Sequence, residues 1–361
     1  MSEKYHITYL DESEYSQWDR FVDSSPQGSI YSTSTFLRAM TEISGTRFNI
    51  LAIRKGEEIV GGVGLHYRSS RWGDVIERRG LLFYNGLIYR DYPTKYPSKK
   101  ATQQINIIRA MIAELESNGY AAVSLSMPGP VEDTRAFTWA GWDVYPQYSY
   151  VVPIDDLDAL WRRTEQNARR LISRCQNARQ TVEQRDDFDC FYTLHEKTYH
   201  QHGLEPYFPR ETFRHLYDTL RDHGYAGLFF ALMPDGRPVS TQIVLSTGHP
   251  VTHTWVAGSD RDYAHTGVTA LLRWEVFKIY HQRGYAYNDL TDAMNEPVAR
   301  FKAQLGGDLV YSPIISRTNS RALRLHNKFQ TNLIDPIHSM IRRMRPGPST
   351  NGNVNDASEE M

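Results

Sequence analysis

The feature that most constrains this chain is a weak internal repeat. Residues 48–67 and 227–248 each contain two apolar, β-rich runs separated by a turn that combines charged residues with glycine. This arrangement is typical of a β-hairpin. A hairpin of the same kind in each half indicates that one supersecondary plan is used twice.

Two further correspondences follow in the same order. A helical pattern in each half ends at a glycine, Gly119 or Gly284, and a strand follows. A second pair, Gly141 and Gly306, closes a short helix before another strand, and the spacing from the first glycine to the second is 22 residues in both halves. Glycine is favoured where a helix ends in a left-handed residue. The order in each half is helices, hairpin, helix, strand, short helix and strand, which predicts two copies of one α/β module with mixed sheets.

The predicted boundaries follow from this repeat. Residues 1–150 form the first domain and residues 151–318 the second, which we expect to open with a long helix over residues 157–180. Residues 319–345 are expected to form a C-terminal helical segment. Residues 346–361 are small and polar, a composition typical of a disordered tail.

Composition excludes several classes of protein. The 361 residues carry 41 Lys and Arg against 42 Asp and Glu, so the whole surface is not a nucleic-acid footprint. Two cysteines exclude a disulfide framework and a cysteine-based metal cluster. The chain has no signal-peptide pattern, no apolar run long enough to span a bilayer, and no motif with metal-ligand spacing. We therefore expect a cytoplasmic protein without a metal, a prosthetic group or a membrane span.

Several segments of the second half, in this order, resemble the FemAB-like family of aminoacyl and acyl transferases. They are Asn167-Ala168-Arg169-Arg170-Leu171-Ile172, Tyr207-Phe208-Pro209, Trp255-Val256-Ala257-Gly258-Ser259-Asp260, the Leu271-Leu272-Arg273-Trp274 helix, and Arg300-Phe301-Lys302 before Leu305-Gly306-Gly307. The resemblance implies two tandem GNAT-type domains that form an amide by acyl transfer to an amine. In the family's best-known members the donor is aminoacyl-tRNA and the acceptor is a peptidoglycan precursor.

One departure from the family bears on the donor. Members that use tRNA often carry a long coiled-coil insertion in the second domain, and no segment between residues 157 and 223 is long enough for one. Acyl-CoA is therefore the alternative co-substrate.

The resemblance places a lysine that faces the donor or the developing oxyanion at Lys302. Arg300 lies two residues away and cannot share its helix face, so it is a secondary candidate for substrate binding. An ammonium group at Lys302 would bind a donor phosphate or stabilise negative charge. The alternative is a solvated lysine on an amphipathic helix.

Asp289 ends a strand that we expect to be central, where α/β folds place polar groups for ligands. Its carboxylate could accept a proton from the attacking ammonium or hold the acceptor amine. It could equally cap the following turn, in which case Asp292 is the nearby substitute.

A GNAT domain that binds coenzyme A holds the pyrophosphate on backbone N–H groups at a helix N-terminus. Here only Gly267 in residues 263–270 fits the usual glycine-rich pattern. The degraded pattern favours a donor other than acetyl-CoA, and Gly267 could simply start the helix.

Residues 161–185 are rich in arginine, and Arg169 and Arg170 lie within the family-like motif. They could hold the phosphates of tRNA or form a solvated helix face. Tyr207 and Trp255 could line an acceptor pocket, although aromatic side chains are more often part of a core.

These features together predict transfer of an aminoacyl group from aminoacyl-tRNA to the amine of a small molecule or a cell-wall precursor. The alternatives are an acyl-CoA-dependent N-acyltransferase and, from another class, a non-catalytic binding module.

Overall fold

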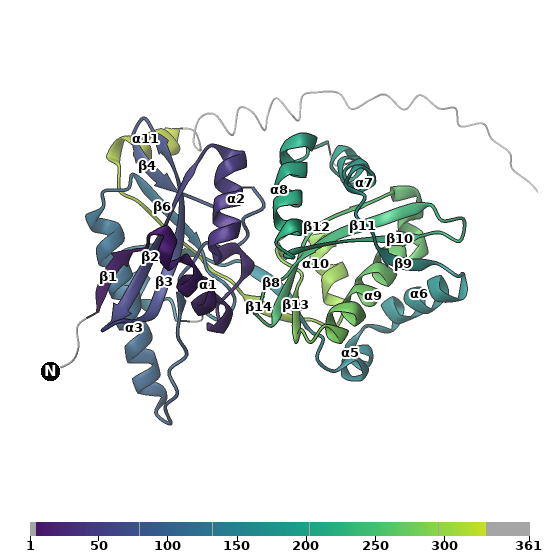
Figure 1. The fold of residues 1–361 in the computed structure, drawn as a ribbon, viewed down its shortest axis with the longest axis horizontal. Helices are drawn as coiled ribbons and strands as arrows, with labels where there is room; N and C mark the ends of the chain where they lie inside the picture. The colour runs from purple at the N-terminus through teal and green to yellow at the C-terminus, as the bar shows by residue number, and fades with distance from the viewer. Residues whose placement is uncertain (1–4, 79, 132, 202, 295, 330–361) are drawn as a thin grey trace, which may run out of the picture.

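The computed structural model describes residues 5–329 except positions 79, 132, 202 and 295. These residues form two mixed sheets flanked by helices, which lie side by side along the long axis of the molecule (Figure 1). No helix in this part of the chain is both long enough and apolar enough to cross a membrane.

The first sheet and its helices come from the N-terminal half. The strands are β1 (His6–Tyr9), β2 (Arg47–Lys55), β3 (Glu58–Ser70), β4 (Gly73–Ile76), β5 (Ile88–Tyr89), β6 (Ala122–Ser126) and β7 (Asp143–Tyr145). The helices are α1 (Tyr15–Ser24), α2 (Ser34–Ser44), α3 (Pro97–Ser117) and α4 (Arg135–Trp139), with short 3-10 turns at Glu12–Glu14 and Ile30–Ser32.

The second half repeats this order. Its strands are β8 (Tyr148–Pro153), β9 (Thr181–Gln184), β10 (Ala226–Leu232), β11 (Pro238–Leu245), β12 (Val251–Ser259), β13 (Tyr287–Asp289), β14 (Asp308–Tyr311) and β15 (Ile314–Thr318). Its helices are α5 (Leu157–Arg163), α6 (Gln166–Asn177), α7 (Phe188–Gln201), α8 (Arg210–Asp222), α9 (Val268–Gln282), α10 (Glu296–Ala303) and α11 (Arg321–Phe329), with a 3-10 helix at Arg261–Thr266.

The repeat is visible in the sheets. The strand orders are β1-β2-β3-β4-β6-β15-β7 and β9-β10-β11-β12-β13-β8-β14, and the fourth and fifth strands of each are parallel. Gly119 and Gly284 have φ of 68° and 87°, the left-handed conformation predicted for the two helix ends.

The two halves exchange strands, which changes the expected domain boundaries. β8 follows β7 in the chain but pairs with β13 and β14 of the second sheet. β15 follows β14 but pairs with β6 and β7 of the first sheet. A division at residue 150 therefore cuts β8, and the end of the 151–318 segment belongs to the first sheet. Hydrogen-bond pairing across the sheets, which a linear pattern does not contain, decides this exchange.

The prediction of one long helix over residues 157–180 is wrong. It is two helices, α5 and α6, separated at Thr164, whose backbone is extended (ψ 131°). Glu165 N donates to Gln304 O at 2.9 Å, and a Cβ on Gly306 would lie 3.2 Å from Thr164 N, so the turn after α10 packs into the break. Helix α6 ends at Asn177, close to the expected end at residue 180, and β9 follows.

The interface between the halves is a continuous core. Buried aromatic residues of both halves meet there, including Tyr31, Phe36, Tyr84, Phe213 and Trp255. Helices α2 and α8 lie side by side across this interface (Figure 1). The centre of the interface is therefore filled by side chains, while two cavities are lined by residues of both halves.

The C-terminal helical segment begins as expected, with α11, which lies on the first domain beside β15 (Figure 1). The remainder of the expected segment, residues 330–345, and the expected tail, residues 346–361, lie outside the described residues.

Candidate active site

A large cavity opens where two parallel strands of the second sheet diverge. β12 pairs with β13 only over Val251–His253, and β12 then continues while the chain after Asp289 turns away. The cavity between them has a volume of about 710 Å³. Carboxyl ends of strands at such a divergence are a common ligand site in α/β folds. Apolar side chains from both halves line much of its wall: Leu81, Phe83, Leu204, Trp255, Leu290 and Val298.

Lys302 reaches this cavity from α10. Its ammonium group donates to the carbonyl oxygens of Thr291 and Asp292, the latter at 2.6 Å. An ammonium has three N–H donors, so one remains for the cavity. Burial, together with the charge of Arg273, lowers the pKa of Lys302 to about 8. Thr291 and Asp292 have φ of 50° and 26°, and this uncommon backbone presents both carbonyls to the lysine.

Arg273, on α9, is a second cation that lines the same cavity. It is 7% exposed, and burial lowers the pKa of its guanidinium to about 10. Its Nη1 has no hydrogen-bond partner, and no ion pair joins Arg273 to a carboxylate of the described residues. In the sequence, Arg273 lies three residues after Ala270 and four residues before Phe277. It therefore shares one helix face with these two buried positions. Arg273 was not among the predicted site residues, although it lies in the motif Leu271–Trp274.

His195, on α7, also lines the cavity, together with Asp292 and Tyr199. Its Nδ1 lies 3.1 Å from Ala257 O, which fixes Nδ1 as the protonated nitrogen and leaves a lone pair on Nε2. Nε2 has no hydrogen-bond partner, and burial lowers the pKa of the imidazole below 6.5. A neutral imidazole is therefore present beside the cavity at pH 7. A lone histidine in an amphipathic helix gives no distinctive sequence signal.

Asp289 does not line this cavity. Its buried carboxylate accepts hydrogen bonds from Tyr84 Oη at 2.6 Å, Thr291 N at 2.7 Å and Ser149 Oγ, and it lies 3.4 Å from His253 Nδ1. Burial alone would raise the pKa of Asp289, but these contacts more than offset it and the pKa is lowered. Thr291 joins Asp289 to Lys302 through its own N–H and carbonyl.

The sequence of the second domain matches a known domain family. Residues 162–303, which supply Lys302, Arg273 and His195, match the model of the acetyltransferase (GNAT) domain family. This part of the second domain therefore has a GNAT-type sequence. No curated protein matches the chain in sequence.

Solved structures extend the likeness to both domains. The crystal structure of FemX has a TM-score of 0.68 at 14% identity, covering 91% of this chain and 99% of FemX. L-PGS from Bacillus licheniformis has a TM-score of 0.54 at 13% identity, covering 90% and 98%. A tandem GNAT protein from the clavulanic acid biosynthesis pathway has a TM-score of 0.51 at 11% identity, covering 87% and 98%. The predicted tandem GNAT fold and the resemblance to FemAB-like proteins are confirmed.

Within this GNAT domain, Gly267 marks the expected pyrophosphate loop before α9. It has φ of 93°, and a Cβ there would lie 2.6 Å from Leu171 Cβ. Val268 N is bonded to Thr266 Oγ1, and Arg174 of α6 donates to the carbonyls of His265 and Thr266. Helix α6 therefore packs against this loop, and Gly267 is required by that packing.

The other predicted binding residues lie in different places. Trp255 lines the cavity and donates through Nε1 to Leu81 O at 2.8 Å, which ties the two domains together. Tyr207 is exposed, packs near Gly80 and lies outside the cavity lining. Arg300 is exposed and pairs with Glu296 at 3.3 Å, also away from the cavity.

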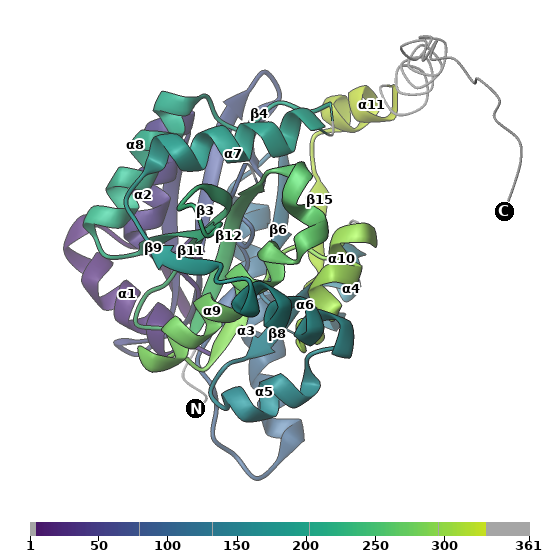
Figure 2. The same ribbon diagram turned by 90° about the vertical axis from the view of Figure 1, so that its right-hand side faces the viewer.

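The basic stretch lies on α5, on α6 and in the turn before β9, with Arg185 directly after β9. Arg169 is half-buried and Arg170 is exposed, with Asn167 as its partner. Among the described residues, no carboxylate forms an ion pair with Arg162, Arg169, Arg170 or Arg179. Phe301 of α10 packs against α6, so this basic surface is next to the helix that carries Lys302 (Figure 2).

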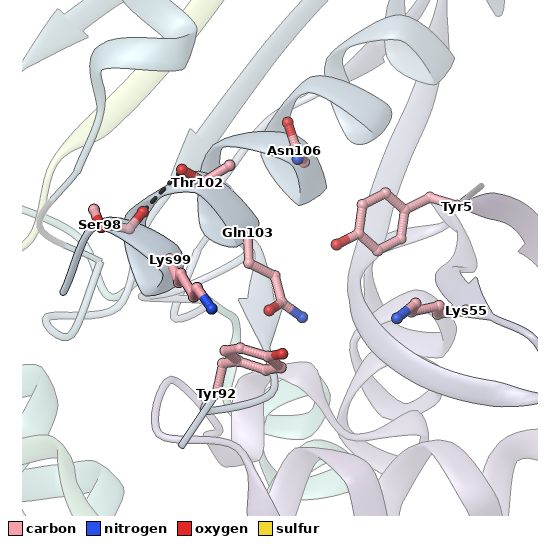
Figure 3. Close-up of a pocket in the computed structure, with 8 residues that line it drawn as sticks. All are labelled: Tyr5, Lys55, Tyr92, Ser98, Lys99, Thr102, Gln103 and Asn106. Carbon is pink, nitrogen blue, oxygen red and sulfur yellow. Dashed lines mark hydrogen bonds between the residues drawn. The ribbon is translucent and has the colours of Figure 1, made fainter. Parts of the chain in front are cut away.

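A separate cavity of about 330 Å³ lies in the first domain between β2 and α3 (Figure 3). Lys55 and Tyr5 face Lys99 and Gln103 across it. Its lysines are at the surface, and it holds no buried charged group, so the cavity at Lys302 is the stronger candidate for chemistry.

Proposed function

We propose that this protein forms an amide bond by transferring an aminoacyl group from aminoacyl-tRNA to an amine at the Lys302 cavity. The observation that carries the proposal is a pair of cations, the buried Arg273 and the half-buried Lys302, which line one cavity and form no ion pair with a carboxylate of the described residues, although Asp292 lines the same cavity. Burying such charges is costly unless an anion binds them. Acyl transfer supplies one, because negative charge develops on the carbonyl oxygen.

The chemistry follows from the three polar groups. The neutral amine attacks the ester carbonyl carbon, a C–N bond forms, and the C–O bond to the ribose breaks. Lys302 donates its free N–H to the developing oxyanion, and Arg273 adds a second positive charge. His195 accepts, at Nε2, the proton that the amine loses and passes it to the ribose oxygen as that oxygen leaves. Asp289 is a positioning residue, because its acceptor sites are filled and it acts on Lys302 through Thr291.

Two features support tRNA over acyl-CoA as the donor. The N-terminus of α9, where a coenzyme pyrophosphate is expected, is capped by Thr266 and covered by Leu171. The arginines Arg162, Arg170 and Arg179 are exposed on α5, on α6 and directly after α6, and Phe301 of α10 packs against α6. Phosphate contacts of this kind dominate affinity for nucleic acids.

The acceptor is proposed to be the amine of a small molecule or of a cell-wall precursor. An apolar wall suits it, because desolvation favours the neutral amine that attacks the carbonyl. The buried cations would also bind an anionic group on such an acceptor.

The test uses purified protein with radiolabelled aminoacyl-tRNA or acyl-CoA and a panel of amines. We expect amide product that disappears after RNase treatment of the donor. Lys302→Met should lower kcat by about 10²–10³-fold, the usual cost of losing an oxyanion donor. Arg300→Met is the matched control, since Arg300 is exposed on the same helix, and it should change kcat less than about twofold.

Other outcomes would redirect the proposal. Product that forms equally well after RNase treatment would contradict the tRNA donor and favour acyl-CoA. A cellular function that survives both Lys302→Met and Arg273→Met would contradict catalysis and favour a binding module. His195→Gln tests the role of the base separately from the role of the cations. This variant should have a lower kcat and an unchanged affinity for the donor.

A further inference from the structure

A second cavity lies on the other side of Asp289. It has a volume of about 460 Å³, within the range typical of small-molecule sites, and it lies where the two domains meet. Residues of the first domain (Pro26, Ser29, Pro128) face residues of the second (Val251, Tyr287, Val310). Tyr84 contributes to this cavity, while Leu81 and Phe83 line the one at Lys302. The two cavities are therefore separate.

The polar groups of this cavity are clustered and incompletely satisfied. His253 is 3% exposed, and neither of its ring nitrogens has a hydrogen-bond partner. Its Nδ1 lies 3.4 Å from the Asp289 carboxylate. The hydroxyl of Ser29, which is 1% exposed, is also unpartnered. Buried polar groups in proteins are usually hydrogen-bonded, so this cluster suits a ligand that supplies the missing partners.

The charge of the lining restricts the ligand. Among the described residues that line the cavity, Asp289 is the only carboxylate, and there is no lysine or arginine. His249 also lines it, but burial and the nearby His253 lower the pKa of His249 to about 4, so it is neutral at pH 7. The contacts of Asp289 lower its pKa and keep it anionic. The cavity therefore favours a cation over an anion.

The orientation of His253 also favours a cationic ligand. Nδ1 is directed at the carboxylate, so Nε2 is the ring nitrogen left for a ligand. In the neutral imidazole with its proton on Nδ1, Nε2 accepts a hydrogen bond, so a ligand that meets this form donates one. The remaining wall is apolar: Pro26, Pro128, Pro130, Val151, Val251 and Val310.

We propose that this cavity is a second ligand site, which binds a primary ammonium group attached to a compact apolar body. The ammonium donates to His253 Nε2 and lies in the field of Asp289, and the prolines and valines cover the apolar body. The site is distinct from the Lys302 cavity and does not depend on the transfer reaction proposed there.

The test measures binding to the full chain by calorimetry, with no acyl donor present. The probes are 2-phenylethylammonium, the neutral 2-phenylethanol and the anionic phenylacetate. We expect the ammonium to bind about tenfold more tightly than the alcohol, because its hydrogen bond is charge-assisted, and phenylacetate not to bind. Equal affinity for the alcohol, tighter binding of phenylacetate, or no binding of the ammonium would overturn the proposal.

Amino-acid substitutions test whether the ligand binds in this cavity. Val310→Trp fills the cavity and should abolish binding, whereas Leu309→Trp adds the same side chain at the neighbouring exposed position of β14 and should not. His253→Met removes the acceptor and should weaken binding about tenfold. Unchanged affinity in folded Val310→Trp protein would place the ligand elsewhere. Lys302→Met should leave binding intact, so failure of the transfer reaction and failure of this site are distinguished.

Discussion

Replacing Arg273 with methionine should stabilise the fold while it impairs the reaction. The guanidinium is buried, and its pKa falls from 12.5 to about 10. A shift of about 2.5 units corresponds to roughly 3 kcal/mol of unfavourable free energy for the charged form. Methionine keeps a long flexible side chain and removes the charge. After allowance for imperfect packing, we expect the free energy of unfolding to rise by about 1–3 kcal/mol.

Urea denaturation followed by circular dichroism measures this change. With a denaturant slope of about 3 kcal/mol/M, the midpoint should rise by about 0.3–1 M. Arg162→Met is the matched control, because Arg162 is exposed on α5, and it should change stability by less than about 0.5 kcal/mol. A loss of more than about 1 kcal/mol in Arg273→Met would refute the reasoning, since it would mean that the charge is well solvated or paired in the folded state. Stability gained together with activity lost is the pattern expected of a strained functional group.

Further predictions concern the same region. Amide formation should fall as pH rises through about 8, where Lys302 loses its proton, and in Arg273→Met this limb of the pH–rate profile should move to higher pH because the repelling charge is gone. The free energy of unfolding should rise between pH 8 and 10.5 more in the wild type than in Lys302→Met, because over that interval the unfolded lysine binds the proton that the folded one has lost. Tyr84→Phe should cost about 1–3 kcal/mol of stability by removing a buried donor to Asp289, whereas Tyr207→Phe, at an exposed position, should be neutral in the same denaturation assay. Gly267→Ala should destabilise the protein more than Gly224→Ala, because both glycines have positive φ but only the first meets a neighbouring side chain.

The sequence determined the architecture because its signals are local and periodic. Hairpins, helix ends and the 22-residue spacing of paired glycines are set by residues close together in the chain, and they recur in both halves. They predicted the duplicated α/β module, and the resemblance of the second half predicted the GNAT fold. Lys302 was selected from a motif, and it does line a cavity.

The tertiary structure decided which groups share that cavity. Asp289 and Lys302 are close in sequence, yet they face different cavities because the backbone at Thr291 passes between them. Arg273 and His195 come from helices far apart in the chain, and only packing brings them to the diverging strands. The exchange of β8 and β15 is likewise a matter of pairing between distant segments. Such contacts depend on which surfaces meet in the folded chain, and no local pattern in the sequence predicts them.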